Sequence, residues 1–80
     1  MQVLTYEVTD TASTIAKVTE KAKENGLTIS GTNEAGTLTG MGVEAAYKTE
    51  ENKIIIYIEK KPFFLTDDKI KSELDKFFGI

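Results

Sequence analysis

The stretch Lys53-Ile54-Ile55-Ile56-Tyr57-Ile58-Glu59 decides the fold of this chain. Its density of β-branched and aromatic side chains is typical of a strand that is buried in a sheet. The polar segment Thr49-Glu50-Glu51-Asn52 precedes it as a turn, and Pro62 ends it because proline has no amide hydrogen for a sheet ladder. We expect this strand to anchor the hydrophobic core.

After this strand the sequence predicts a C-terminal helix. Thr66 is a good N-cap residue, and Asp67 and Asp68 follow in the first turn, where carboxylates complement the helix dipole. Apolar side chains then recur at the i, i+4, i+7 and i+8 spacing of one helix face: Ile70, Leu74, Phe77 and Phe78. We expect this face to pack on the sheet.

Before the central strand, the N-terminal part predicts a strand and a helix. Residues 2–8 alternate between two faces, as a half-buried strand does. Residues 9–11 supply possible N-caps, and Asn25-Gly26 can end the helix. The expected inner stripe of this helix consists mostly of small residues: Ala12, Ile15, Ala16, Thr19, Ala22 and Lys23.

The middle of the chain is harder to assign. Residues 27–30 predict a second strand, residues 33–36 form a turn cluster, and a long strand from Thr37 to Tyr47 contains Gly40 and Gly42. The two glycines indicate a bulge or kink in this strand, or a break between two strands. Gly40-Met41-Gly42 resembles the start of a dinucleotide-binding loop, but no third glycine and no helix follow it.

These elements predict one α+β domain spanning residues 1–80. Its expected order is strand, helix, strand, strand, strand, helix, with a four-stranded antiparallel sheet and both helices packed on one face. Apolar residues make up 40% of the 80 residues and charged residues 29%, which is typical of a folded domain.

Composition argues against most catalytic chemistry. The chain has no histidine and no cysteine, so it lacks the commonest general base, the best thiol nucleophile and the usual transition-metal ligands. The carboxylate pairs Glu50-Glu51 and Asp67-Asp68 are typical of solvated turns and helix starts. We therefore expect no enzyme, no catalytic residues, no cofactor and no metal site.

Charge and hydropathy restrict the partners. A net charge of -3 gives no attraction to phosphate backbones, so we expect no nucleic-acid binding. The longest apolar runs are far shorter than a membrane span, which needs roughly 20 residues. The first residues lack the basic start and apolar run of a secretory signal, and we expect a cytoplasmic protein.

The candidate interaction patch is Lys60, Lys61, Phe63, Phe64 and Leu65, around Pro62. In one interpretation, Phe63 or Phe64 plugs the end of the core, Leu65 staples the start of the helix and the lysines are solvated. In the other, part of the cluster stays exposed and docks on an apolar or anionic surface. The residue types alone leave both interpretations open.

From residue 36 to residue 78 the sequence resembles a small bacterial family, the polyhydroxyalkanoic acid system or granule-region proteins. The resemblance rests on the order of elements, on Gly42-Val43, and on the passage from the isoleucine-rich strand through Pro62-Phe63-Phe64-Leu65 into residues 70–74. It implies a non-enzymatic protein associated with storage granules of hydrophobic polyester.

The sequence therefore predicts a non-catalytic binding or structural module. Its expected partners are a hydrophobic surface, such as a polyhydroxyalkanoate granule, or a second copy of the chain. Two alternatives stay open: a carrier of a small hydrophobic ligand, with a pocket between the sheet and the C-terminal helix, and a protein without a ligand.

Overall fold

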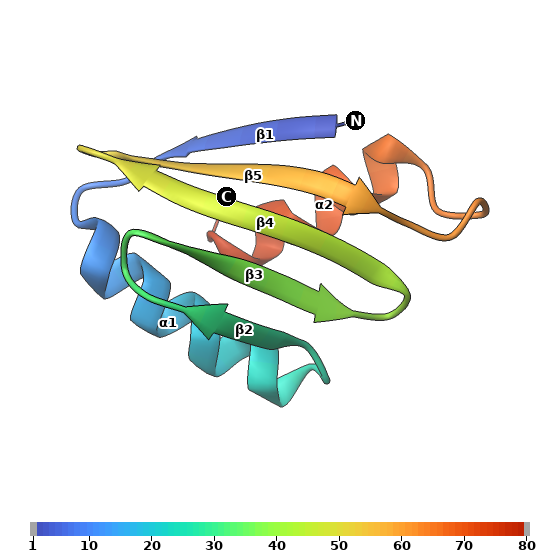
Figure 1. Cartoon of the computed structure of the whole chain (residues 1–80), viewed down its shortest axis with the longest axis horizontal. Coiled ribbons are helices and arrows are strands. Elements are labelled where there is room, and N and C mark those ends of the chain that lie inside the picture. Colours follow the sequence, from blue (N-terminus) through green and yellow to red (C-terminus); the bar gives the residue numbers. More distant parts are fainter. Residues whose placement is uncertain (1, 80) are drawn as a thin grey trace.

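A computed structural model describes residues 2–79 and shows an antiparallel sheet with both helices on one of its faces (Figure 1). Along the chain, the elements are β1 (Gln2–Glu7), α1 (Thr11–Glu24), β2 (Thr28–Gly31), β3 (Ala35–Gly40), β4 (Val43–Glu50), β5 (Lys53–Lys60) and α2 (Asp67–Phe77). The predicted α+β class, the antiparallel sheet and the placement of the helices are confirmed.

The strand order in the sheet is β1-β5-β4-β3-β2, with every neighbouring pair antiparallel. The predicted anchor strand β5 lies between β1 and β4, and its inward residues Ile54, Ile56 and Ile58 are between 1% and 4% exposed. A strand in the middle of a sheet buries its inward face well, which explains Ile54, Ile56 and Ile58.

The predicted strand count of four is wrong, because residues 2–79 form a sheet of five strands. Gly40 pairs with Val43, so Met41 and Gly42 form a two-residue hairpin turn between β3 and β4. Their φ angles of 55° and 79° are the positive pair that a type I′ turn requires. The irregularity expected at residues 40–42 is thus a chain reversal, and a register shift occurs between Glu44 and Ala45.

Helix α1 begins where Asp10 accepts hydrogen bonds from the backbone N–H groups of Ala12 and Ser13. Its buried residues are Ile15, Val18 and Ala22. The expected stripe therefore missed Val18 and wrongly included Ala12, Ala16 and Lys23, which are exposed. The reason is that small residues recur at intervals of three or four on more than one face of this helix. Only the position of the sheet decides which of these faces is buried.

Helix α2 agrees with its prediction. Thr66 is its N-cap, and Asp67 and Asp68 lie in the first turn. Ile70 and Leu74 are buried, and the two phenylalanines near its end pack partly buried against the same core. No helix in the described part of the chain is long and apolar enough to cross a membrane.

The face of the sheet away from the helices is uncovered by any element of residues 2–79 (Figure 1). Side chains alternate along each strand, so Val3, Ile55, Tyr57 and Ala46 lie on this open face, opposite the buried residues of β1, β5 and β4. Val3 is 51% exposed.

Candidate functional site

The loop between β5 and α2 presents two phenylalanines to solvent. The backbone N–H of Leu65 donates to the carbonyl of Pro62 at 3.1 Å, which closes a turn with Phe63 and Phe64 at its two corners. Phe63 is 97% exposed and Phe64 71% exposed. The two rings pack edge to face, with their centroids 5.8 Å apart. The interpretation of these residues as plugs of the core is therefore wrong.

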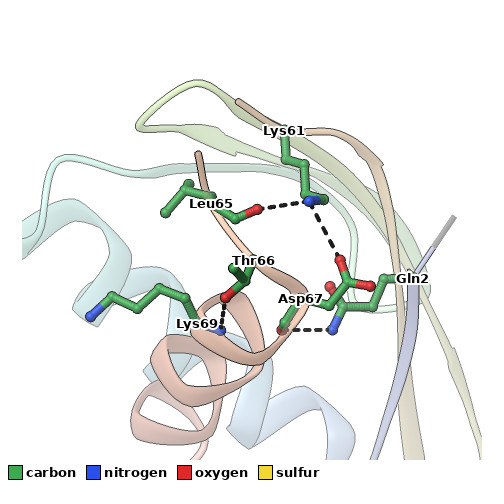
Figure 2. A network of polar contacts seen from close by, with 6 residues as sticks. All are labelled: Gln2, Lys61, Leu65, Thr66, Asp67 and Lys69. Atoms are coloured by element: carbon green, nitrogen blue, oxygen red, sulfur yellow. Dashed lines mark hydrogen bonds and ion pairs between the residues drawn. The ribbon is translucent and has the colours of Figure 1, made fainter. Parts of the chain in front are cut away.

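Polar contacts hold this loop against the body of the protein (Figure 2). The Lys61 ammonium donates to the carbonyl of Leu65 at 2.7 Å and pairs with the Asp67 carboxylate at 3.6 Å. The Gln2 amide, on β1, donates to the carbonyl of Asp67 at 2.9 Å, and the Thr66 hydroxyl accepts from the N–H of Lys69. The phenylalanines thus sit on a braced turn.

The two lysines of the predicted patch have different environments. Lys61 bends back into the loop, where 33% of its side chain remains exposed. Its ammonium group contacts the Leu65 carbonyl of the same loop and the Asp67 carboxylate at the start of α2. Lys60 pairs with Glu44 on the neighbouring strand β4 at 3.8 Å. Leu65 occupies the position before the N-cap and packs against the core cluster that includes Ile70, as a hydrophobic staple does.

A third exposed apolar side chain lies at the same end of the sheet. Met41, at the corner of the β3–β4 turn, is 72% exposed. A Cβ atom on its neighbour Gly42 would lie 2.7 Å from Cγ of Pro62, so this turn touches the phenylalanine loop. We call Met41, Phe63 and Phe64 the phenylalanine patch. The sequence did not reveal Met41, although a methionine before a glycine in a suspected turn is a usable signal.

An apolar groove opens beside the phenylalanine patch. It has a volume of about 370 Å³ and lies between the β3–β4 hairpin, the loop after α1, and α2. Its apolar lining includes Leu27, Leu38, Val43, Ile58, Leu65 and Phe77. The charged residues that line it, Lys69 and Glu73, pair with each other at 3.3 Å. Met41 and Leu65 connect the groove to the patch.

The opposite end of the sheet carries a broad, open depression of about 920 Å³. Its lining is mainly polar and includes Glu7, Glu50, Glu51 and Lys53. Glu50 pairs with Lys48 at 3.1 Å, and Glu51 is the corner of the β4–β5 turn. Within residues 2–79, no three acidic side chains converge in a way that could hold a metal ion.

Two tyrosines, Tyr6 and Tyr47, are buried within residues 2–79. Burial, then the hydrogen bond to Asp75 and its charge, raises the pKa of Tyr6 well above its ordinary range. Burial likewise raises the pKa of Tyr47, whose hydroxyl donates to the carbonyl of Thr32 at 2.5 Å. Because both shifts keep the phenols protonated, neither group is prepared to act as a base near neutral pH.

Comparisons with known proteins returned no match: no family model fits the chain, and no curated protein or solved structure is significantly similar to it. The functional argument for this protein therefore rests on its own residues and geometry.

Proposed function

We propose that this protein is a non-catalytic binding module that attaches to an uncharged, apolar surface through the phenylalanine patch. The observation that carries the proposal is the exposure of Phe63 and Phe64, at 97% and 71%, on a turn held by hydrogen bonds. Large apolar side chains gathered at one place on a small protein mark an interaction site more often than scattered ones do.

The backbone at Met41 supports the same proposal. A φ angle of 55° is unfavourable for residues other than glycine and asparagine. Because the Met41 side chain is 72% exposed, packing contacts do little to offset this backbone strain. Glu51 has a similar φ angle, 48°, at the corner of the β4–β5 turn, but its side chain is charged. Met41 is distinguished by an exposed apolar side chain at such a position, as expected where a side chain contacts a partner.

The charges near the patch favour an uncharged surface over an anionic membrane. Lys60 is paired with Glu44, Lys61 is turned into its own loop, and Asp67 and Asp68 follow directly. Binding to anionic lipids relies on clustered unpaired cations, and the net charge of -3 opposes it. The surface of a polyester storage granule, which the sequence resemblance implies, has the required uncharged apolar chemistry.

The test is co-sedimentation with polyhydroxyalkanoate particles. The double variant Phe63→Ser, Phe64→Ser should lose binding, because burying one phenylalanine contributes roughly 1.5–3 kcal/mol, or more than tenfold in affinity for each ring. Its stability to denaturant should change by less than about 0.5 kcal/mol, because both rings are exposed in the free protein.

Val3→Ser is the matched control, because Val3 is also exposed but lies on β1, outside the phenylalanine patch. It should bind the particles as the unaltered chain does, and binding should be insensitive to salt. Equal binding by the double variant would refute the proposal, and preferential binding to anionic vesicles would replace the granule with a membrane.

A cytoplasmic location is part of the proposal. The chain holds its small core together without any cysteine, whereas small secreted domains commonly rely on disulfides.

The groove supports a second candidate function, the transport of a small hydrophobic ligand. Its volume of about 370 Å³ and its apolar lining fall within the range of ligand sites, toward the small end. Val43→Phe would fill the groove and should abolish the fluorescence gain of an apolar probe such as anilinonaphthalene sulfonate. The Phe63→Ser, Phe64→Ser variant should keep that signal, and no signal with either chain would exclude the carrier.

A further inference from the structure

Strand β1 is a free edge of the sheet. It ends the strand order β1-β5-β4-β3-β2, and a shallow hollow of about 660 Å³ runs along it, lined by β1 itself, Lys53, Lys71 and Asp75. No other strand within residues 2–79 pairs with its outer side. A free edge presents a row of unpaired N–H and C=O groups that can accept another strand.

The register identifies which backbone groups are free. The N–H of Val8 donates to the carbonyl of Asn52 at 2.8 Å, which places Val8 among the residues that bond to β5. Residues alternate along an antiparallel ladder, so Leu4 and Tyr6 also bond to β5. The backbone groups of Val3, Thr5 and Glu7 therefore point outward.

Strand β1 carries few of the features that block edge pairing. Proline, lysine and a bulge are all absent from its six residues, and its one charge is Glu7 at the end. The other edge, β2, has only four residues and ends in Gly31. The two edges therefore differ, and β1 is the one suited to accept a partner strand.

We propose that the partner is a second copy of this chain, which pairs its own β1 antiparallel to the first and joins the two sheets into one. In the proposed register, Val3 lies opposite Thr5 of the second copy, and Leu4 lies on the two-fold axis. Each Val3 and Thr5 pair exchanges two hydrogen bonds, and the same residues serve both copies, as a two-fold interface requires.

The side chains select both the register and the occupant. On the open face, Val3 neighbours Tyr57 and Thr5 neighbours Ile55 within one copy. The proposed register places these two uncharged pairs side by side across the axis and covers Val3, which is 51% exposed. A shift by two residues in one direction would instead put Glu7 against Val3. A shift by two in the other direction would leave only residues 2–4 of β1 paired. The self-complementary, uncharged stripe is the reason to choose a second copy over an unrelated peptide.

The test is the molar mass in solution of Thr5→Pro and Thr5→Val. Proline at position 5 removes an outward N–H and leaves the ladder to β5 intact, a placement that edge strands tolerate. Valine keeps the N–H and the β-branched shape. The unaltered chain and Thr5→Val should approach twice 8.8 kDa as concentration rises, and Thr5→Pro should need a roughly tenfold or higher concentration to do so.

Hydrogen exchange of the unaltered chain provides a measurement that does not depend on the folding of a variant. The amides of Val3 and Thr5 should exchange more slowly at high concentration than at low concentration. The proposal is overturned if the unaltered chain stays at 8.8 kDa at every concentration, if Thr5→Pro dimerises like Thr5→Val, or if the two amides show no concentration dependence.

Discussion

At the scale of single residues, Met41 combines two unfavourable features. Its φ angle of 55° is one that asparagine and glycine adopt more easily, and its side chain is 72% exposed. The turn itself suits the hairpin, because Gly42 takes the second positive φ angle, 79°. Met41 is therefore a poor residue for the stability of the turn, and its side chain is nonetheless apolar and exposed.

Met41→Asn should stabilise the protein. It would create Asn-Gly, the pair that type I′ turns favour, and relieve about 1 kcal/mol of backbone strain. The free energy of unfolding in urea measures this change. Met41→Leu is the control, because it keeps both the strain and an apolar side chain, and its stability should match that of the unaltered chain. Equal stability of the asparagine and leucine variants would contradict the explanation.

At the scale of elements, Tyr6 of β1 holds the C-terminal half of α2. The Tyr6 hydroxyl donates to the Asp75 carboxylate at 2.7 Å, and the Tyr6 ring stacks on Phe78 with centroids 4.2 Å apart. Lys71 completes the group with a 2.9 Å contact to the other Asp75 oxygen. The C-terminal half of the helix is thus fixed to the edge strand by both polar and aromatic contacts.

Asp75→Asn should change how stability depends on acidity. Lys71, and then Tyr6, stabilise the charged carboxylate and hold the pKa of Asp75 below its ordinary value of 3.8. A lowered pKa in the folded state contributes stability that is present above the ordinary pKa and is lost as the pH falls through the folded pKa. The variant should therefore be less stable at neutral pH and lose less stability below about pH 4.

Urea unfolding at a series of pH values measures this difference. Glu20→Gln is a suitable control because it also removes one carboxylate, from an exposed position on α1. Its acid dependence should resemble that of the unaltered chain. If Asp75→Asn lost stability as steeply as that control below pH 4, the carboxylate would not be the acid-sensitive contact.

At the scale of the whole molecule, the proposed surfaces occupy separate places. The phenylalanine patch and the groove lie at the end where β5 meets the loop before α2. The proposed dimer uses the outer side of β1, the strand at one edge of the sheet (Figure 1). Each set of variants can therefore serve as a control for the other: particle binding should survive Thr5→Pro, and self-association should survive Phe63→Ser with Phe64→Ser.

Much of this fold was predictable from local patterns. The isoleucine alternation of β5, the Thr66 cap and the apolar face of α2 repeat at the periods of the elements that they form, and these predictions are confirmed. For residues 37–47 the sequence left a bulge and a break between two strands both open, because glycines suit a bulge and a turn equally well. The choice between a bulge and a turn depends on whether residues 43–50 can pair as a separate strand between β3 and β5.

The sequence by itself determined the class of fold, the buried strand and the segment rich in phenylalanine, because periodicity and residue type are local properties. Only the tertiary structure decided that Phe63 and Phe64 face solvent, that Met41 joins them, and that β1 is a free edge. Exposure depends on which distant segments fill the space around a side chain. In this chain, Leu65 occupies the inward position beside α2, and the hydrogen bond from Lys61 to the carbonyl of Leu65 closes the loop that carries the two rings.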